Sequence, residues 1–381
     1  MERLLRAQMD AGASDLHLRA GSLPLLRRNG DIEPMEGEAA IAGDYLLAMV
    51  QSIMPEDVRR LYADTGDADF AHEVDGAGRF RINAFRDRLG PGTVARSIPT
   101  RIVSAEELGL SAEVRALSQL SRGLVLVTGP TGSGKSTTLS ALVDLVNATR
   151  QDHIVTIEDP IEFVHPSKGC LVTQRQVGSH TQSFKHALRA ALREDPDVVL
   201  VGELRDLETV SIAIETAETG HLVFGTLHTS TAASTVDRII DQFPPDRQSQ
   251  VRVMLSESLK GVVSQTLCRK IGGGRVAAME ILLVTPALSN LIREGKTFQM
   301  TSIMQTSKKL GMVTMLDALV SLVERGLVEP QEAYLRSPDK AGIVQQLKAR
   351  GFDVSFAEVD APAAPPGNSG ATSRTPVGAR R

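Results

Sequence analysis

The sequence contains few cysteines and few aromatic side chains. Its 381 residues include only two cysteines, Cys170 and Cys268, no tryptophan, and 3% aromatic residues. Two cysteines so far apart form neither a C-x-x-C zinc or redox motif nor a disulfide framework, so we expect reduced, intracellular thiols. The scarcity of aromatic rings argues against a protein that stacks single-stranded nucleic acid.

Long apolar segments and an excess of positive charge are also missing. The chain lacks an apolar run of about 18 residues, and residues 1–15 lack the apolar segment of a signal peptide. A net charge of -4 offers no overall basic field for direct nucleic-acid binding. We therefore expect no membrane span, no direct nucleic-acid partner and a cytoplasmic location.

The length of the chain predicts two structured domains. Residues 1–100 combine short strand patterns, glycine-rich breaks and helical segments, which predicts a small α+β domain with an antiparallel meander. The Asn29-Gly30 pair within it is typical of a hairpin turn. A polar linker, 101–122, follows. Residues 123–285 alternate buried strands with amphipathic helices, which predicts an α/β core around a mostly parallel, doubly wound sheet.

Two further segments complete the chain. Residues 286–352 have a nearly continuous helical pattern and form the predicted carboxy-terminal region. Residues 353–381 are rich in Pro, Ala, Gly and Ser and are predicted to form a disordered tail. Within the core, the apolar pattern also predicts a helix over Val251–Leu267.

The most specific motif is a glycine-rich loop between a buried strand and a helix. It matches G-x-x-x-x-G-K-[ST], in the context where this motif binds nucleotide phosphates. Its backbone N–H groups can face phosphate oxygens, Lys135 is placed to reach the β- and γ-phosphates, and the Ser136 hydroxyl to bind Mg²⁺. The predicted nucleotide-binding residues are Gly129, Pro130, Thr131, Gly132, Ser133, Gly134, Lys135, Ser136 and Thr137.

Acidic side chains follow two other strands of the predicted core. One buried strand closes on Glu203, which is placed to bind Mg²⁺ together with Ser136. A second strand leads into Glu158, Asp159 and Glu162, and such crowding favours a divalent cation or a base that activates water. On spacing alone, a solvated polar loop remains an alternative for this second segment.

Histidine and arginine supply further candidates. His221 and His228 flank the strand LVFGTL and are candidates to sense the γ-phosphate, whereas zinc is disfavoured because no cysteine or third histidine accompanies them. The amino-terminal domain is rich in arginine, whose guanidinium group suits phosphate charge, although a solvated strand face is the default for most of these residues. They are Arg79, Arg81, Arg86, Arg88, Arg96 and Arg101.

Four motifs, in this order and spacing, resemble those of the secretion ATPases of type II, type IV pilus and related systems. They are TGPTGSGKSTT, TIEDPIEF, DPDVVLVGELRD and TGHLVFGTLHTSTA. GASDLHL, NLIREGK and GLVEPQEA further resemble the twitching-motility retraction type, and the likeness covers roughly residues 1–350. It implies a PAS-like amino-terminal domain, a RecA-like ATPase core, and a homo-hexamer with ATP and Mg²⁺ at subunit interfaces.

The resemblance also implies roles and partners. By motif position, Glu162 is the general base, Glu203 the Walker B acid for metal and water, and His228 the His-box residue. Arg81 and Arg96 match arginines that reach a neighbouring subunit's nucleotide. The implied partners are an inner-membrane pilus platform protein and a paralogous retraction ATPase, so the chain would sit at the inner membrane through the pilus machinery.

Several alternatives stay open. Ser289 in ALSNLIRE stands where the retraction type usually carries arginine, which leaves the paralogue undecided. Pilus-extension and type II secretion ATPases are the nearest alternative, but they usually carry an extra amino-terminal domain and a four-cysteine zinc module. A DNA-handling RecA-like motor is a further alternative, but this chain has no excess of basic residues that would bind DNA. A non-hydrolysing accessory ring subunit is disfavoured by the intact Lys135, Glu162 and Glu203.

Overall fold

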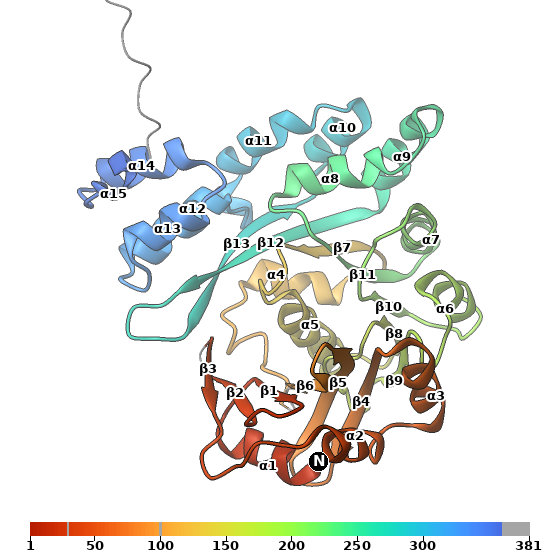
Figure 1. Ribbon diagram of the computed structural model, residues 1–381. Coiled ribbons are helices and arrows are strands. Elements are labelled where there is room, and N and C mark those ends of the chain that lie inside the picture. Colours follow the sequence, from red (N-terminus) through yellow and green to blue (C-terminus); the bar gives the residue numbers. More distant parts are fainter. Residues whose placement is uncertain (29, 99–100, 360–381) are drawn as a thin grey trace, which may run out of the picture. The chain divides into compact units, whose positions relative to one another are not determined.

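The computed structural model of the chain describes residues 1–28, 30–98 and 101–359 (Figure 1). The expected turn residue Asn29 and the tail residues 360–381 lie outside the described residues. The chain forms two compact units, the first made of Met1–Gln265 and Met279–Thr314, the second of Thr266–Ala278 and the residues from Met315 on.

The amino-terminal part of the first unit is an antiparallel sheet with the strand order β3-β2-β1-β6-β5-β4. Alternate strand residues, such as Leu16 and Leu18 of β1, enter one core with three helices, which confirms the predicted α+β domain and its meander. The strands are β1 (Asp15–Arg19), β2 (Leu25–Arg28), β3 (Asp31–Pro34), β4 (Ala68–Val74), β5 (Gly78–Asp87) and β6 (Gly90–Ile98). The helices are α1 (Glu2–Asp10), α2 (Gly43–Gln51) and α3 (Glu56–Thr65).

The second sheet has the order β13-β12-β7-β11-β10-β8-β9, and its pairs from β12 to β9 are parallel. Alternate residues of β7 enter two separate cores, Leu124 and Leu126 one, Val125 and Val127 the other, so both faces are covered. This confirms the doubly wound core. The strands are β7 (Gly123–Thr128), β8 (His153–Glu158), β9 (Leu171–Gln176), β10 (Val198–Val201), β11 (Leu222–Leu227), β12 (Leu259–Arg269) and β13 (Arg275–Leu283).

The helices of this core begin with α5 directly after the glycine-rich loop. Most of them follow a strand of the sheet, as the predicted alternation requires. They are α5 (Lys135–Thr149), α6 (Phe184–Ala191), α7 (Leu207–Glu218), α8 (Ala232–Asp241), α9 (Pro245–Ser258), α10 (Pro286–Glu294) and α11 (Met300–Thr306).

The helix predicted over Val251–Leu267 is wrong in its second half. Helix α9 ends at Ser258, and Leu259–Arg269 forms β12, which pairs in parallel with β7. Pairing in the sheet overrides a local pattern that fits either structure. Strand β9 also forms in a segment for which we predict no element.

The structure differs from the predicted division of the chain into segments in three further places. The predicted linker 101–122 contains a short helix, α4 (Ala112–Ala116). The first helices of the predicted region 286–352 belong to the first unit, because Leu288 and Met300 enter the core of the large sheet. The predicted tail begins with a short helix, α15 (Phe356–Val359).

The second unit has a core of its own. Its helices pack around Cys268 and Ala278, which belong to the ends of β12 and β13. The helices are α12 (Met315–Glu324), α13 (Pro330–Arg336) and α14 (Lys340–Ala349).

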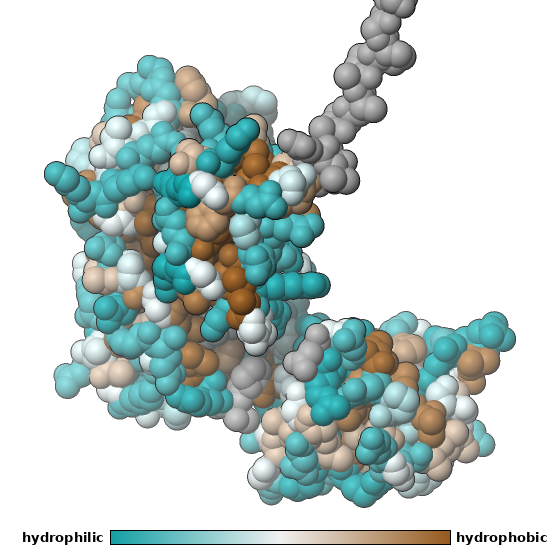
Figure 2. Space-filling model, turned by 90° about the vertical axis from the view of Figure 1, so that its left-hand side faces the viewer, coloured by the Kyte–Doolittle hydropathy of each residue, from teal (hydrophilic) through white to brown (hydrophobic). Residues whose placement is uncertain are grey.

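Hydrophilic side chains cover most of the molecular face in Figure 2, and apolar ones form smaller areas between them. Among the described residues, no helix combines the length and the apolar character needed to cross a membrane.

Candidate active site

The glycine-rich loop joins the end of β7 to the start of α5, as predicted. Gly129 has a φ of +143°, and a Cβ atom there would lie 2.2 Å from the carbonyl oxygen of Gln265. Gly134, the residue before α5, has a left-handed φ of 89°. Both positions therefore require glycine, and the chain turns so that the N-terminus of α5 opens toward the end of the sheet.

A buried glutamine holds this loop against the sheet, although the sequence does not predict a role for it. Gln265 of β12 is 2% exposed, and its Nε2 donates to the carbonyl oxygen of Ser133 at 2.7 Å. Its Oε1 accepts from the hydroxyl of Thr138 on α5 at 2.9 Å. One side chain thus ties β12 to the loop and to the first turns of α5.

Lys135 lies against the loop that precedes it. Its Nζ donates to the carbonyl oxygens of Gly129, at 2.9 Å, and Pro130, at 3.2 Å. Burial lowers the pKa of Lys135, and the nearby carboxylates of Glu203 and Glu162 oppose that shift. The lysine therefore lies within electrostatic reach of both predicted acids.

Glu203 follows β10 and lies between Arg205 and His228. Its Oε2 is 2.7 Å from Nη2 of Arg205, and its Oε1 is 3.1 Å from Nε2 of His228, which follows β11. Burial raises the pKa of Glu203, but the hydrogen bond and charge of Arg205, with His228 and Lys135, lower it further, so the net shift is downward. This carboxylate is ionised, and Arg205 is a neighbour that the sequence does not predict.

The two histidine candidates separate. His228 lies in the site, whereas His221 precedes β11 at the other end of the strand and pairs through Nδ1 with the carbonyl oxygen of Thr216 at 3.1 Å. The expectation that His221 senses phosphate is therefore wrong, because a strand places its two ends far apart.

The crowded acidic segment contains two different kinds of carboxylate. Glu158 ends β8, and its Oε1 accepts from the hydroxyl of Thr156 at 2.6 Å and from Nε2 of Gln174 at 3.2 Å. Burial raises the pKa of Glu158 despite these hydrogen bonds. Glu162 is exposed, and the buried side chains of Ile161 and Phe163 anchor the segment on either side of it.

These elements surround a cavity of about 320 Å³. The resemblance predicts that Arg81 and Arg96 reach a neighbouring subunit's nucleotide, whereas in this chain they line the same cavity as its own glycine-rich loop. Of the other arginines, Arg86 lies over the ring of Tyr62. The predicted residues that line the cavity are Arg81, Arg96, Thr131, Gly132, Lys135, Ser136, Glu158, Asp159, Glu162, Glu203 and His228.

Comparison with known proteins places this geometry in a family. The family model for the type II/IV secretion system protein matches residues 67–273. The type IV pilus retraction ATPase PilT of Pseudomonas aeruginosa strain PAO1 is 52% identical over 335 residues, which cover 87% of this chain and 96% of that protein. A twitching motility protein of Neisseria gonorrhoeae is 50% identical, with 82% and 84% of the two chains covered.

A solved structure agrees with these relatives. The crystal structure of the pilus retraction motor PilT with bound ADP is 47% identical, with a TM-score of 0.84 over 89% of this chain and 97% of that one. The chain belongs to the type II/IV secretion system protein family. It is an ATPase of that family, with the RecA-like core and amino-terminal domain that the motifs predict.

The donor set of this secretion ATPase suits a magnesium nucleotide. The hydroxyl oxygen of Ser133 is buried and has no hydrogen-bond partner among the described residues. Ser136 and Glu203 line one cavity, and Mg²⁺ needs only one or two protein oxygens because phosphates and water supply the rest. In the part of the chain that the structure describes, no group of three or more His, Cys, Asp or Glu residues forms a fuller metal cage.

Proposed function

We propose that this chain is the ATP-driven motor that retracts a type IV pilus and so powers twitching motility. The observation that carries the proposal is the similarity to a pilus retraction ATPase over 96% of that protein's length. The cavity adds the chemistry of ATP hydrolysis, because a phosphate-binding loop lines it together with acidic side chains that include Glu162 and Glu203 and arginines that include Arg81 and Arg96.

ATP binds through the glycine-rich loop. Lys135 exchanges the two loop carbonyls for phosphate oxygens, which are better partners for an ammonium group. The hydroxyl of Ser136 and the carboxylate of Glu203 would hold Mg²⁺, which would neutralise charge on the phosphates. Arg81 and Arg96 line the same cavity and add positive charge that stabilises the charge on the phosphate oxygens in the transition state.

Glu162 serves as the base that orients the attacking water. Glu158 is the competing candidate, but its Oε1 is occupied by Thr156 and Gln174, and burial favours its protonated form. Glu162 is exposed in the cavity and free of such burial. His228 and Arg205 hold Glu203 in place from two sides.

The motor acts as a homo-hexamer at the cytoplasmic side of the inner membrane. It contacts the pilus platform protein there and works beside a paralogous retraction ATPase. The resemblance of the four motifs and the likeness to PilT support this arrangement. Ser289, on α10, stands where the usual retraction type carries arginine.

Complementation of a gene deletion tests the proposal. We expect cells without the chain to carry surplus pili and to lose twitching, and the parent chain to restore both. Glu203→Gln removes the charge that holds Mg²⁺ and should fail to restore them. Glu218→Gln, the same change on the exposed end of α7, should restore them fully.

The alternatives give different outcomes. A pilus-extension ATPase would leave deletion cells without pili, and a type II secretion ATPase would leave pili unchanged but block export. Restoration by Glu203→Gln would show that ATP turnover at this site does not drive retraction.

A further inference from the structure

Four charged side chains lie in one row across four strands of the amino-terminal sheet. Arg27 of β2 is opposite Asp15 of β1, Asp15 is opposite Arg96 of β6, and Arg96 is opposite Arg81 of β5. Side chains at opposite positions share one face of a sheet. The row therefore brings three guanidinium groups and one carboxylate together, and its last two members line the nucleotide cavity.

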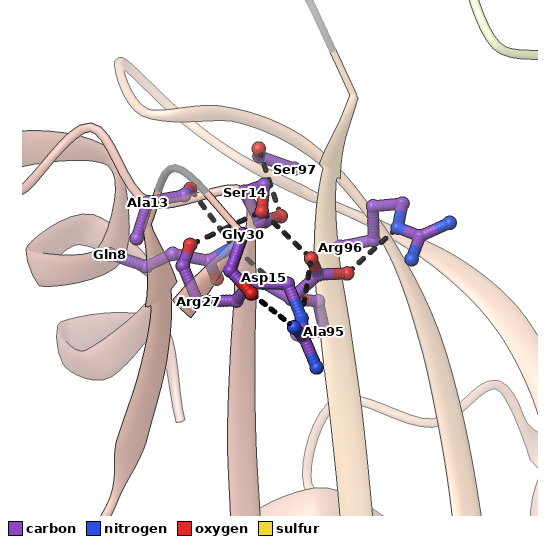
Figure 3. A network of polar contacts seen from close by, with 9 residues as sticks. All are labelled: Gln8, Ala13, Ser14, Asp15, Arg27, Gly30, Ala95, Arg96 and Ser97. Carbon is purple, nitrogen blue, oxygen red and sulfur yellow. Dashed lines mark hydrogen bonds and ion pairs between the residues drawn. The ribbon is translucent and has the colours of Figure 1, made fainter. Parts of the chain in front are cut away.

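The carboxylate in this row is buried, and the arginine beside it is not. Asp15 is 3% exposed, and its Oδ1 is 2.7 Å from Nε of Arg96. Its Oδ2 accepts from the hydroxyl of Ser14 at 2.8 Å and lies 3.9 Å from Nε of Arg27. The side chain of Arg96 is 67% exposed. In Figure 3 its Nε faces Asp15, while its two terminal nitrogens point away from the carboxylate.

A buried glutamine holds the backbone on both sides of this ion pair. Gln8 of α1 is fully buried, and its Nε2 donates to the carbonyl oxygens of Ser14 and Ala95, each at 3.1 Å (Figure 3). Those two residues directly precede Asp15 and Arg96. The hydrogen bonds of Gln8 thus fix the backbone next to Asp15 and Arg96.

We propose that Asp15 is a positioning residue for ATP hydrolysis, because it holds Arg96 by Nε and leaves both terminal nitrogens for phosphate oxygens. This proposal rests on the proposed role of Arg96 at the nucleotide. Opposite positions bring Arg96 beside Arg81, and like charges so placed repel. Asp15 offsets that repulsion on one side only, so Arg96 keeps one orientation instead of several.

A purely structural role predicts a different pattern. If Asp15 only stabilised β1, its replacement would lower unfolding temperature and leave the kinetics of the folded enzyme alone. If it acts through Arg96, its replacement changes kcat/KM for ATP, and the change disappears once Arg96 is removed. Kinetics on paired variants therefore separate the two roles.

The experiment measures ATP turnover and thermal unfolding of the full chain. We expect Arg96→Ala to lower kcat/KM by about 10- to 100-fold and Asp15→Asn by about 3- to 10-fold. The double variant should match Arg96→Ala alone. Asp87→Asn, which breaks the 2.6 Å ion pair with Arg19 elsewhere on the same sheet, should leave kcat/KM unchanged.

A second variant keeps the test independent of the stability of β1. Arg96→Lys retains the charge, but one ammonium group cannot meet Asp15 and a phosphate as the guanidinium fork does. We expect a loss like that of Asp15→Asn, and normal kinetics in Arg96→Lys would overturn the proposal. So would an Asp15→Asn loss that persists undiminished in the Arg96→Ala background. Normal kinetics in Arg96→Ala would instead refute the role of Arg96 itself.

Discussion

Glu158 and Glu162 lie four residues apart in one acidic segment, yet their surroundings give them different chemistry. The first is buried and hydrogen-bonded through Oε1, and the second is exposed in the cavity. A general base needs an ionised, reachable oxygen, so burial alone separates the two candidates. Spacing along the chain contains no such information, and the sequence therefore predicts an acidic cluster more securely than it predicts which acid acts.

Another buried group, His165, gives a test at low pH. This residue is 6% exposed, and its Nε2 lies 3.4 Å from the hydroxyl of Ser140 on α5. Burial lowers the pKa of His165 from 6.5 to about 4. Between these two values the unfolded chain binds a proton that the folded chain does not, so stability falls as the pH falls through that window.

We expect wild type to lose about 2 to 3 kcal/mol more than His165→Gln between about pH 7.5 and pH 4.5, because glutamine does not titrate. Urea unfolding of both proteins at the two pH values measures the difference. All other titrating groups are shared, so they cancel in the comparison. An equal loss in both proteins would show that His165 is protonated in the folded state.

At the scale of secondary structure, β12 connects the catalytic loop to the sheet. Gln265 reaches the loop only because Leu259–Arg269 is a strand beside β7. A helix in that segment would remove this contact. The position of the loop therefore depends on an element that the local pattern misassigns.

Replacement of this glutamine tests the dependence. Gln265→Leu keeps the approximate volume but leaves the carbonyl oxygen of Ser133 and the hydroxyl of Thr138 without their partner. We expect a stability loss of about 1 to 3 kcal/mol and weaker ATP binding, since the loop loses its support. Gln119→Leu, on the first unit but remote from the loop, is the control for a lost glutamine amide. ATP affinity at the wild-type value in folded Gln265→Leu would show that the loop does not depend on Gln265 for its position.

The elements that sequence predicts well are those with local causes. The G-x-x-x-x-G-K-[ST] motif and its strand–loop–helix context predict the loop at Gly129, and a continuous apolar run predicts β7. Two of the missed residues depend on long-range pairing, because Gln265 contacts Thr138 and Asp15 contacts Arg96. Arg205 lies only two residues from its partner Glu203, but in the sequence it is typical of an ordinary polar loop.

At the scale of the whole molecule, the source of the cavity's arginines decides how the subunits of the proposed homo-hexamer would cooperate. Arg96 lines the cavity of its own chain, so each subunit carries a complete set of predicted groups. We expect that mixing inactive Arg96→Ala with inactive Lys135→Ala restores no activity, even where the two co-assemble. Co-purification through a tag on one variant verifies assembly. Recovered activity would show instead that the arginine serves a neighbour's nucleotide, as the resemblance implies.

We propose that Lys135 binds ATP while Glu162 activates the water that cleaves it. The most direct measurement is ATP affinity alongside phosphate release for the purified wild type, Lys135→Ala and Glu162→Gln. We expect Lys135→Ala to lose tight ATP binding. We expect Glu162→Gln to bind ATP within a few-fold of wild type but to release phosphate at a rate that is lower by about 100-fold or more. Phosphate release near the wild-type rate in Glu162→Gln would show that Glu162 is not the base and that another acid takes this role, first of all Glu158.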